Sequence, residues 1–213
     1  MANLRVRQGV ETRSRLVTHA RRLFANAGFD RTRFDAIGAS LGMTSGVMYH
    51  HFRNKRELFE EVVRQCHAEI AQAVVRRAEA EPDLMAGILR GCLTFIEEVI
   101  SPRYIRIVLI DSVAVLGWQT WKEIDAAYSE RTLAQALSEA RDLGVLAPGI
   151  PVGALARFIS GGTNELALWV YHQRDRAAAL KQAEVVLGHL VGRLGEDLRP
   201  RIEHRGATQR RQG

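Results

Sequence analysis

The sequence predicts an all-α protein of about nine helices, with a three-helix head at its N-terminal end and a larger helical bundle behind it. Apolar residues recur at steps of three and four along most of the 213 residues, which is the period of an amphipathic α-helix. The sequence has no sustained alternation of apolar and polar residues and no Asn-Gly or Asp-Gly hairpin turn. Glycines and prolines lie between the periodic runs and divide them into separate helices.

Three helices make up the predicted head. The first carries its apolar face over residues 16–27 and is followed by Gly28, a C-cap candidate. Thr32 offers an N-cap oxygen to the second helix, which Gly42 ends. Thr44 can cap a third, short helix, so the head has the order helix, helix, glycine turn, helix.

The body follows from a fourth helix onward. Asn54 and Glu57 have the spacing of a capping box and open a helix that runs to about Arg77. Pro102 opens the sixth helix and Gly117 separates it from the seventh. The helices that we expect after the fourth span about 83–100, 102–116, 118–143, 152–172 and 176–197.

The distribution of charged residues changes at the boundary between the predicted head and the predicted body. Residues 1–55 hold ten Arg and Lys against three acidic residues, about +7, whereas residues 56–198 hold fifteen against twenty, about −5. Residues 199–213 hold five Arg against one Glu, about +4. This distribution of charge indicates a DNA-binding head on a neutral-to-acidic body. Chance clustering of charge on a solvated surface is the alternative. The predicted parts are a flexible arm (1–9), a helix-turn-helix head (10–55), a sensing and dimerisation body (56–198) and a basic disordered tail (199–213).

Composition narrows the class of protein. The net charge of +6 favours a polyanionic partner. No segment approaches the roughly 18 apolar residues of a membrane span, and the N-terminus has no secretion signal, so we expect a cytoplasmic protein without a membrane partner. Cys66 and Cys92 fit reduced core thiols, and the His50-His51 pair lacks a second cluster with ligand spacing. Catalytic and phosphate-loop motifs are lacking, so we expect no enzyme activity, metal or cofactor.

The run from Thr32 to Leu58 contains the candidate DNA contacts. Met48 and Phe52 are four residues apart and point inward, so the rest of the third helix points outward. Hydroxyls, a glycine and an aromatic ring on this face suit base edges and phosphates in a major groove, although Tyr49 can also be a half-buried core ring. The expected contacts are Thr32, Arg33, Thr44, Ser45, Gly46, Val47, Tyr49, His50 and Lys55.

This run resembles the DNA-binding domain of the tetracycline-repressor (TetR) family. The residues that match the family pattern are Ile37, Gly42, Gly46, Tyr49, Phe52, Lys55 and Leu58, preceded by Gly28-Phe29. Gly38 and Ser40 stand where the family more often has Ala, and Ser45 stands where Lys or Arg is common. The resemblance implies a homodimeric repressor that a small-molecule effector releases from a pseudo-palindromic operator. A regulator without an effector, and a helical enzyme or scaffold that does not bind DNA, are the alternatives.

The resemblance also implies a dimer interface on the last two helices and a ligand cavity among helices four to eight. The dimer candidates, which can alternatively be intramolecular core, are Leu155, Phe158, Ile159, Gly162, Leu166, Val186 and Leu190. The ligand candidates are polar or aromatic residues amid apolar ones, and large aromatic residues can also be core. They are Phe95, Tyr104, Asp111, Trp118, Trp121, Asn164 and Trp169.

Overall fold

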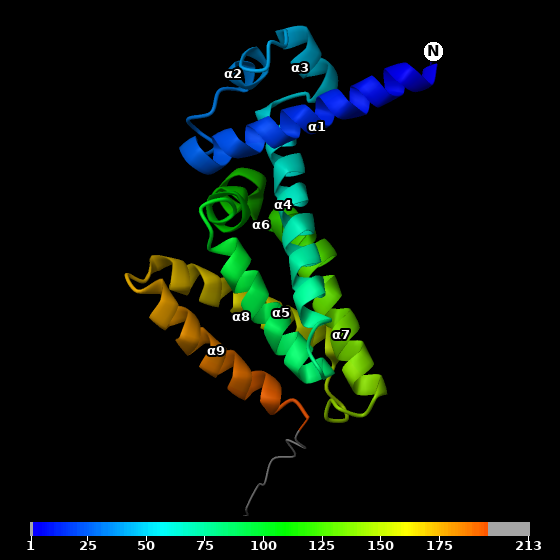
Figure 1. The fold of residues 1–213 in the computed structure, drawn as a ribbon, viewed down its shortest axis with the longest axis vertical. Coiled ribbons are helices and arrows are strands. Elements are labelled where there is room, and N and C mark those ends of the chain that lie inside the picture. The colour runs from blue at the N-terminus through cyan, green and yellow to red at the C-terminus, as the bar shows by residue number, and fades with distance from the viewer. Residues whose placement is uncertain (1, 196–213) are drawn as a thin grey trace, which may run out of the picture.

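Helices form all the regular secondary structure of the part of the chain that the structure describes (Figure 1). The structure is a computed structural model that describes residues 2–195, with side chains from residue 7 onward. The predicted all-α class is confirmed for this range. The elements are α1 (Ala2–Ala27), α2 (Phe34–Ala39), α3 (Ser45–His51), α4 (Lys55–Ala78), α5 (Leu84–Val99), the π-helical η1 (Arg106–Asp111), α6 (Ser112–Asp125), the π-helical η2 (Ala126–Glu130), α7 (Arg131–Asp142), α8 (Val152–His172) and α9 (Arg176–Gly192).

The predicted boundaries are confirmed where a cap or a glycine sets them. Thr44 Oγ1 accepts the backbone N–H of Val47 at 3.4 Å, and Asn54 Oδ1 accepts that of Glu57 at 2.9 Å. Gly42 has a φ of 69°, a left-handed conformation that favours glycine, and it makes the turn between α2 and α3. Local chemistry therefore fixes the turn between α2 and α3 and the start of α4.

The first two helices differ from their predicted starts. Thr32 does not cap α2: Arg33 holds the N-cap position, and the buried Thr32 hydroxyl donates to Gly28 O at 2.8 Å. Residues 2–9, predicted as a flexible arm, are helical and belong to α1. No proline interrupts these residues, and adding residues to an existing helix avoids the cost of a new nucleus.

The middle of the chain is less regular than predicted. The sixth helix starts at Arg106 rather than at Pro102, and its first six residues are π-helical. Gly117 has a φ of 78° and a ψ of 157°, which are not helical, so α6 consists of two helices joined at a kink and the predicted separation at this glycine is confirmed. The predicted helix over 118–143 continues through η2 into α7, which ends at Asp142. Residues 196–213, with the predicted basic tail, lie outside the described residues.

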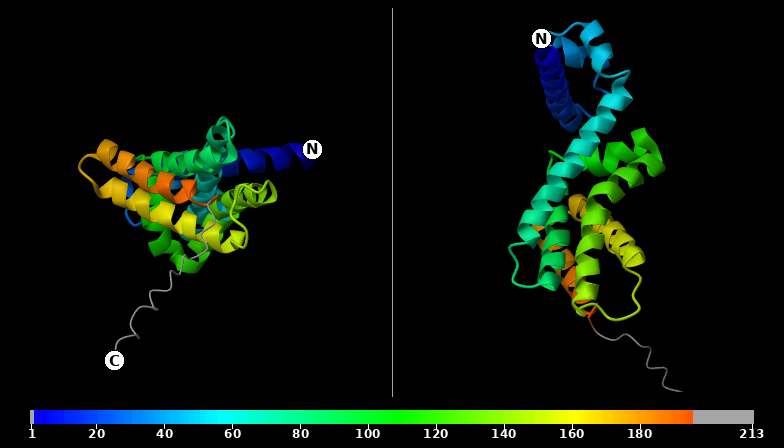
Figure 2. Two further views of the ribbon diagram at one scale, coloured as in Figure 1. Left: turned by 90° about the horizontal axis from the view of Figure 1, so that it is seen from below. Right: turned by 90° about the vertical axis from the view of Figure 1, so that its right-hand side faces the viewer.

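The molecule is elongated, with the head at one end of a long connecting helix. In Figure 1, α1, α2 and α3 lie above the other helices, and α4 runs from them down along the body. Helix α4 packs along α5 and also contacts α1, η1, α6 and η2. Figure 2 shows the same separation from the side, with α8 and α9 packed against each other in the lower part. None of the helices within residues 2–195 has both the length and the apolar character needed to cross a membrane.

One apolar core continues from the head into the body. The fully buried Phe24 of α1 and Phe59 of α4 meet edge to face, with ring centres 5.1 Å apart, and Phe29 packs on both. Edge-to-face aromatic pairs add to the stabilisation from burial alone. The head is therefore packed directly on α4, the helix that also lines the body.

Candidate nucleic-acid interface and body cavity

Helix α3 has one buried face and one exposed face. Met48 is fully buried, and Phe52, which directly follows α3, is 1% exposed, so both point into the head. The residues on the other face are Thr44, Ser45, Gly46, Val47, Tyr49 and His50, and all six are exposed. Six of the nine predicted DNA contacts therefore lie together on one short surface at the tip of the head.

Tyr49 is not a core ring. Its side chain is 57% exposed, and its ring packs edge-on against Phe34 of α2 with the ring centres 5.3 Å apart. Phe34 therefore supports one side of the ring, while most of the side chain stays in solvent. A tyrosine held in this way presents a hydrogen-bonding group without losing much side-chain freedom on binding.

The other three predicted contacts have different environments. Arg33 is exposed at the start of α2. Thr32 is only 5% exposed and its hydroxyl donates within the head, so it does not share the α3 surface. The Lys55 ammonium donates to Phe29 O at 2.8 Å and lies 4.0 Å from the centre of the Phe29 ring. Lys55 therefore ties the start of α4 to the loop after α1.

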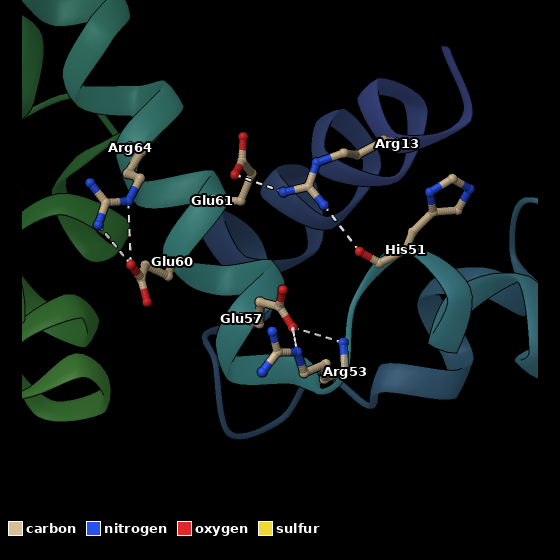
Figure 3. Close-up of polar contacts among 7 residues, drawn as sticks. All are labelled: Arg13, His51, Arg53, Glu57, Glu60, Glu61 and Arg64. Carbon is tan, nitrogen blue, oxygen red and sulfur yellow. Dashed lines mark hydrogen bonds and ion pairs between the residues drawn. The ribbon is translucent and has the colours of Figure 1, made fainter. Parts of the chain in front are cut away.

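Arg13, which the sequence did not single out, holds α3 in place (Figure 3). Its Nη1 donates to His51 O at 3.0 Å, its Nη2 bonds Glu61 Oε2 at 2.9 Å, and its guanidinium lies 4.2 Å from the Phe52 ring centre. One side chain of α1 thus joins the end of α3 to α4. Partial burial, with His50 and Arg13 nearby, lowers the pKa of His51. These contacts link residues 38 and 48 positions apart, so no local sequence pattern indicates them.

A second set of polar contacts joins the head to the body. Arg21 is 8% exposed and forms an ion pair with Glu69 at 2.6 Å, and the Tyr104 hydroxyl donates to the same carboxylate at 2.9 Å. Burial alone would raise the pKa of Glu69, but the hydrogen bonds from Arg21 and Tyr104 outweigh it and lower that pKa. Tyr104 was predicted to contact a ligand, and the structure instead places it at this junction.

Asp111 was also predicted as a ligand contact and also lies at the junction. Its Oδ2 accepts the backbone N–H of Phe29 at 2.9 Å. On the other side, Arg56 of α4 donates to Val115 O at 3.3 Å and to Leu116 O at 3.1 Å, just before the kink at Gly117. Polar contacts therefore bind η1 to the loop after α1, and α6 to the start of α4.

The three tryptophans lie in different environments on α6 and α8. The turn at Gly117 carries Trp118 into solvent, where it is 62% exposed and lies 5.1 Å from Trp121, centre to centre. Trp121 is buried, and its Nε1 donates to Val108 O at 2.8 Å. Trp169 of α8 is 37% exposed. None of the three lines the cavity between α4, α5, α7 and α8, and their role as ligand contacts stays a prediction.

The body contains a cavity of about 530 Å³ between α4, α5, α7 and α8. Phe95 and Asn164 are the two predicted ligand residues that line it. A volume of this size suits a drug-sized organic molecule. The main apolar lining residues are Ala71, Val74, Val75, Leu84, Ile88, Cys92, Leu133 and Ala136.

A buried polar cluster lies behind the cavity wall. Asp125 is fully buried, and its Oδ2 accepts from Lys122 Nζ at 2.9 Å and from Ser160 Oγ, a cavity residue, at 3.3 Å. His67 of α4 is 1% exposed and stacks on Tyr128, and neither ring nitrogen has a hydrogen-bond partner within the described part of the chain. Burial lowers the pKa of His67 to about 4, so the ring is neutral near pH 7.

The outer side of α8 and α9 presents apolar residues to solvent. Phe158 is 68% exposed, and Val186 and Leu190 are about half exposed at 47% and 51%. A Cβ placed on Gly162 would meet nothing within 4 Å, so this part of α8 is open. Three of the other predicted dimer residues differ: Ile159 is 8% exposed, and Leu155 and Leu166 pack partly on the core. Ile159 follows Phe158 by one position, which turns it about 100° around the helix toward the core.

Comparisons with known proteins now identify the family. Residues 16–62 match bacterial regulatory proteins of the tetR family, and residues 85–194 match the tetracyclin repressor-like C-terminal domain. The chain belongs to the TetR family. In the curated proteins, residues of this chain are 35% identical over 100 residues to the probable HTH-type regulator ArpR and 34% identical over 100 residues to the HTH-type regulator TtgR, both of Pseudomonas putida.

Each of these matches covers 46% of this chain and 47% of the relative, so the chain spans about half the length of the curated relatives it matches. A solved TetR-family regulator from Pectobacterium atrosepticum is similar over 88% of this chain and 95% of its own, with a TM-score of 0.76 and 29% identity. A structure of RolR with resorcinol has a TM-score of 0.67 at 14% identity over 88% of this chain and 96% of its own, which shows a shared fold.

Two departures from the TetR pattern have a structural reason. A Cβ on Gly38 would lie 2.5 Å from Met48 Cγ and 2.9 Å from its Sδ, so Met48 occupies the space that an alanine would need. The Ser40 hydroxyl donates to Ile37 O at 2.8 Å and lies 2.6 Å from His19 Nε2. Gly38 therefore leaves room for Met48 of α3 beside α2, and Ser40 lies within hydrogen-bonding distance of His19 of α1.

Proposed function

We propose that the protein is a cytoplasmic, non-enzymatic transcriptional repressor that binds a pseudo-palindromic operator as a homodimer and leaves it when a small molecule enters the body cavity. The observation that carries the proposal is the exposed face of α3, with Tyr49 supported by Phe34 and with Met48 buried behind it. Membership of the TetR family supports the same function, since that family is described as bacterial regulatory proteins.

The chemistry of the head supports DNA as its partner. Thr44 and Ser45 lie at the N-terminus of α3, where free backbone N–H groups favour a phosphate. Gly46 has no Cβ, so a DNA backbone can approach closely, and the methyl groups of Val47 can contact a thymine methyl. Tyr49 and Arg33 extend the same surface, and residues 1–55 carry about +7.

The apolar outer side of α8 and α9 supports a dimer. Single exposed apolar residues are ordinary on a protein surface, but Phe158, Trp169, Val185, Val186 and Leu190 occur together on two adjacent helices. Two such helices from each subunit make a four-helix interface about a twofold axis. A dimer with this axis presents two α3 helices to two half-sites of one operator.

The route from cavity to head runs through α4. This helix lines the cavity with Val74 and Val75 and begins in the head at Lys55. Arg56 and Asp111 connect the same region to α6 and η1. A molecule that binds one arrangement of α4 and α5 better than another shifts the population of head orientations and changes their match to the operator.

The test is operator binding by the purified protein. A duplex selected from random DNA should bind with a dissociation constant of about 10 nM or lower at physiological salt, and should compete at least about 1,000-fold better than random duplex. Tyr49→Ala should weaken binding about 5- to 150-fold, the equivalent of about 1–3 kcal/mol, and Tyr49→Phe should lose less because the ring is kept. Binding without sequence preference, or an unchanged affinity for Tyr49→Ala, would contradict the proposed function.

A further inference from the structure

We propose that the body cavity selects an amphipathic cation: a molecule with one positive group, an apolar chain and a hydroxyl or similar hydrogen-bonding group at the far end. This inference rests on the proposed function of the cavity as an effector site and adds the chemical class of the effector. Three features of the cavity support it: an acidic rim, a long apolar wall, and one enclosed amide without a partner.

Carboxylates surround the outer end of the cavity. Glu79, Glu81 and Asp83 lie on the connection between α4 and α5, and Glu139 lies near the end of α7. Asp83 also caps α5, accepting the backbone N–H of Ala86 at 2.9 Å. Within residues 2–195, none of these four carboxylates takes part in an ion pair.

Among the described residues, the cavity lining has no positive residue to balance this charge. No Arg, Lys or His of this part of the chain belongs to the cavity wall. The nearby Arg77 and Arg90 both pair with Glu97, which does not line the cavity. A positive group at the rim is therefore attracted by unbalanced carboxylates, whereas a carboxylate or phosphate there is repelled.

The wall between the two ends is apolar. It follows α5 from Asp83 to Phe95, a distance of about 18 Å at 1.5 Å per residue. Val74 and Val75 of α4, Ile88 of α5 and Leu133 of α7 are among its apolar residues. An extended alkyl chain or a set of fused rings buries apolar area along this wall, which favours binding.

Asn164 is the polar group that awaits a partner at the inner end. It is 7% exposed, and its Oδ1 has no hydrogen-bond partner among the residues that the structure describes. The hydroxyls beside it are already used, since Thr163 donates to Ile159 O and Ser160 donates to Asp125. An amide offers both an acceptor and donors, and a hydroxyl on the bound molecule can pair with either. A buried amide without a partner is unfavourable, so a group that completes it adds affinity.

The test compares molecules that share one ten-carbon chain. Isothermal titration calorimetry of the full-length protein at pH 7 would use 10-amino-1-decanol, the neutral 1,10-decanediol and the anionic 10-hydroxydecanoate. We expect the ammonium compound to bind at least about tenfold more tightly than the carboxylate, with the diol between them, and this preference should shrink as salt is added. Equal or tighter binding of the carboxylate, or no binding of any of the three, would overturn the proposal.

Charge-matched variants assign the preference to the rim. Glu79→Gln with Glu139→Gln should reduce the affinity for 10-amino-1-decanol several-fold and leave that for the diol unchanged. Glu98→Gln with Glu123→Gln removes the same charge from carboxylates that do not line the cavity and should change neither affinity. An equal loss in both double variants would mean that overall charge, not the cavity rim, produces the preference.

Asn164→Leu tests the inner end. In the unaltered protein, 10-amino-1-decanol should bind about threefold to tenfold more tightly than decylamine, which lacks the hydroxyl; in Asn164→Leu this difference should disappear. A difference that persists would show that the hydroxyl does not meet Asn164. Operator release is measured separately by gel shift: selective binding without release would leave the cavity chemistry intact and contradict the proposed effector function instead.

Discussion

The head and the body of the protein differ in which side chains lie in surroundings that do not match their polarity. In the head, Tyr49 and the hydroxyls around it stand in solvent, although they are able to form hydrogen bonds. In the body, Phe158 stands in solvent although it is apolar. By contrast, both ring nitrogens of His67 and the Oδ1 of Asn164 are buried without a hydrogen-bond partner among the described residues. Each mismatch between a side chain and its surroundings indicates the chemistry of what is expected to meet it.

The two buried polar residues of the body differ in whether a small molecule can reach them. Asn164 lines the cavity and can be reached by a small molecule, whereas His67 does not line it and stacks on Tyr128. Burial favours the neutral form of His67, so protonation of the ring destabilises the folded protein. The same feature, a buried polar group without a partner, thus has a binding consequence in one place and a stability consequence in the other.

The largest expected effect is on the apolar outer side of the body. Phe158→Glu should weaken the proposed dimer at least about 100-fold, the equivalent of about 3 kcal/mol, because the variant places a charge in an apolar contact on both subunits. Sedimentation equilibrium measures this change. Leu143→Glu is the matched control, because Leu143 is 65% exposed but lies outside α8 and α9. If both variants dissociate to the same extent, or neither does, the dimer does not use this face.

Acid should destabilise the body through His67. Its folded-state pKa of about 4 lies below the ordinary value of 6.5, so the unfolded chain binds the proton more readily. The contribution of neutral His67 to the free energy of unfolding is fully present above pH 6.5. As the pH drops from 6.5 to about 4, the free energy of unfolding falls by about 3 kcal/mol. Urea unfolding at several pH values measures the slope.

His67→Leu should flatten this part of the curve, because leucine fills a similar space and does not titrate. Glu69 has a lowered pKa, so the loss of its ionised form appears at more acidic pH and should remain in the variant. A slope between pH 6.5 and 4 that is the same in both proteins would show that another group is responsible.

The junction between the two regions should respond less strongly. Arg21→Met removes one partner of a pair in which Arg21 is nearly buried and the Glu69 side chain is 34% exposed, so we expect a loss of about 2 kcal/mol. Arg13→Met breaks a pair whose side chains are 39% and 41% exposed, and should lose about 1 kcal/mol or less. Urea midpoints at one protein concentration compare the two. Equal losses would mean that burial does not set the strength of these pairs.

The sequence predicted the head better than the body because the signals of the head are local. Thr44 and Asn54 cap helices through atoms only three residues away, and Gly42 sets its turn by its own conformation. The exposed face of α3 follows from Met48 and Phe52 being four residues apart. Thr32 is the exception, because its hydroxyl turns back to Gly28, and the hydroxyl alone does not indicate which acceptor it uses.

The cavity depends on which helices face one another, and periodicity does not determine this. Tyr104, Asp111 and Trp121 have the composition of ligand contacts but meet residues 13 to 82 positions away in the chain. The rim carboxylates Glu79 and Glu139 look like ordinary solvated charges at helix ends, so the sequence gives no sign that they gather at one opening. Adjacent apolar residues such as Phe158 and Ile159 give no indication of which one faces the core.

The smallest expected effect tests how closely the head is packed. Gly38→Ala replaces a residue that is unfavourable in a helix, and propensity alone would predict a gain of up to about 1 kcal/mol. The new Cβ, however, would lie 2.5 Å from Met48 Cγ, which is not the free end of that side chain, and overpacking costs about 1–3 kcal/mol. We therefore expect a net loss of about 1 kcal/mol in urea unfolding.

Met48→Ala provides the control, because it removes the atoms that the new Cβ would meet. The double variant should be less destabilised than the sum of the two single variants by about 1 kcal/mol or more, since residues in contact do not act additively. Gly38→Ala should also weaken operator binding, because Met48 cannot move without shifting α3 against α2. If Gly38→Ala is more stable and binds DNA normally, there is room for the new Cβ between α2 and α3. The packing of Met48 would then not fix the position of α3.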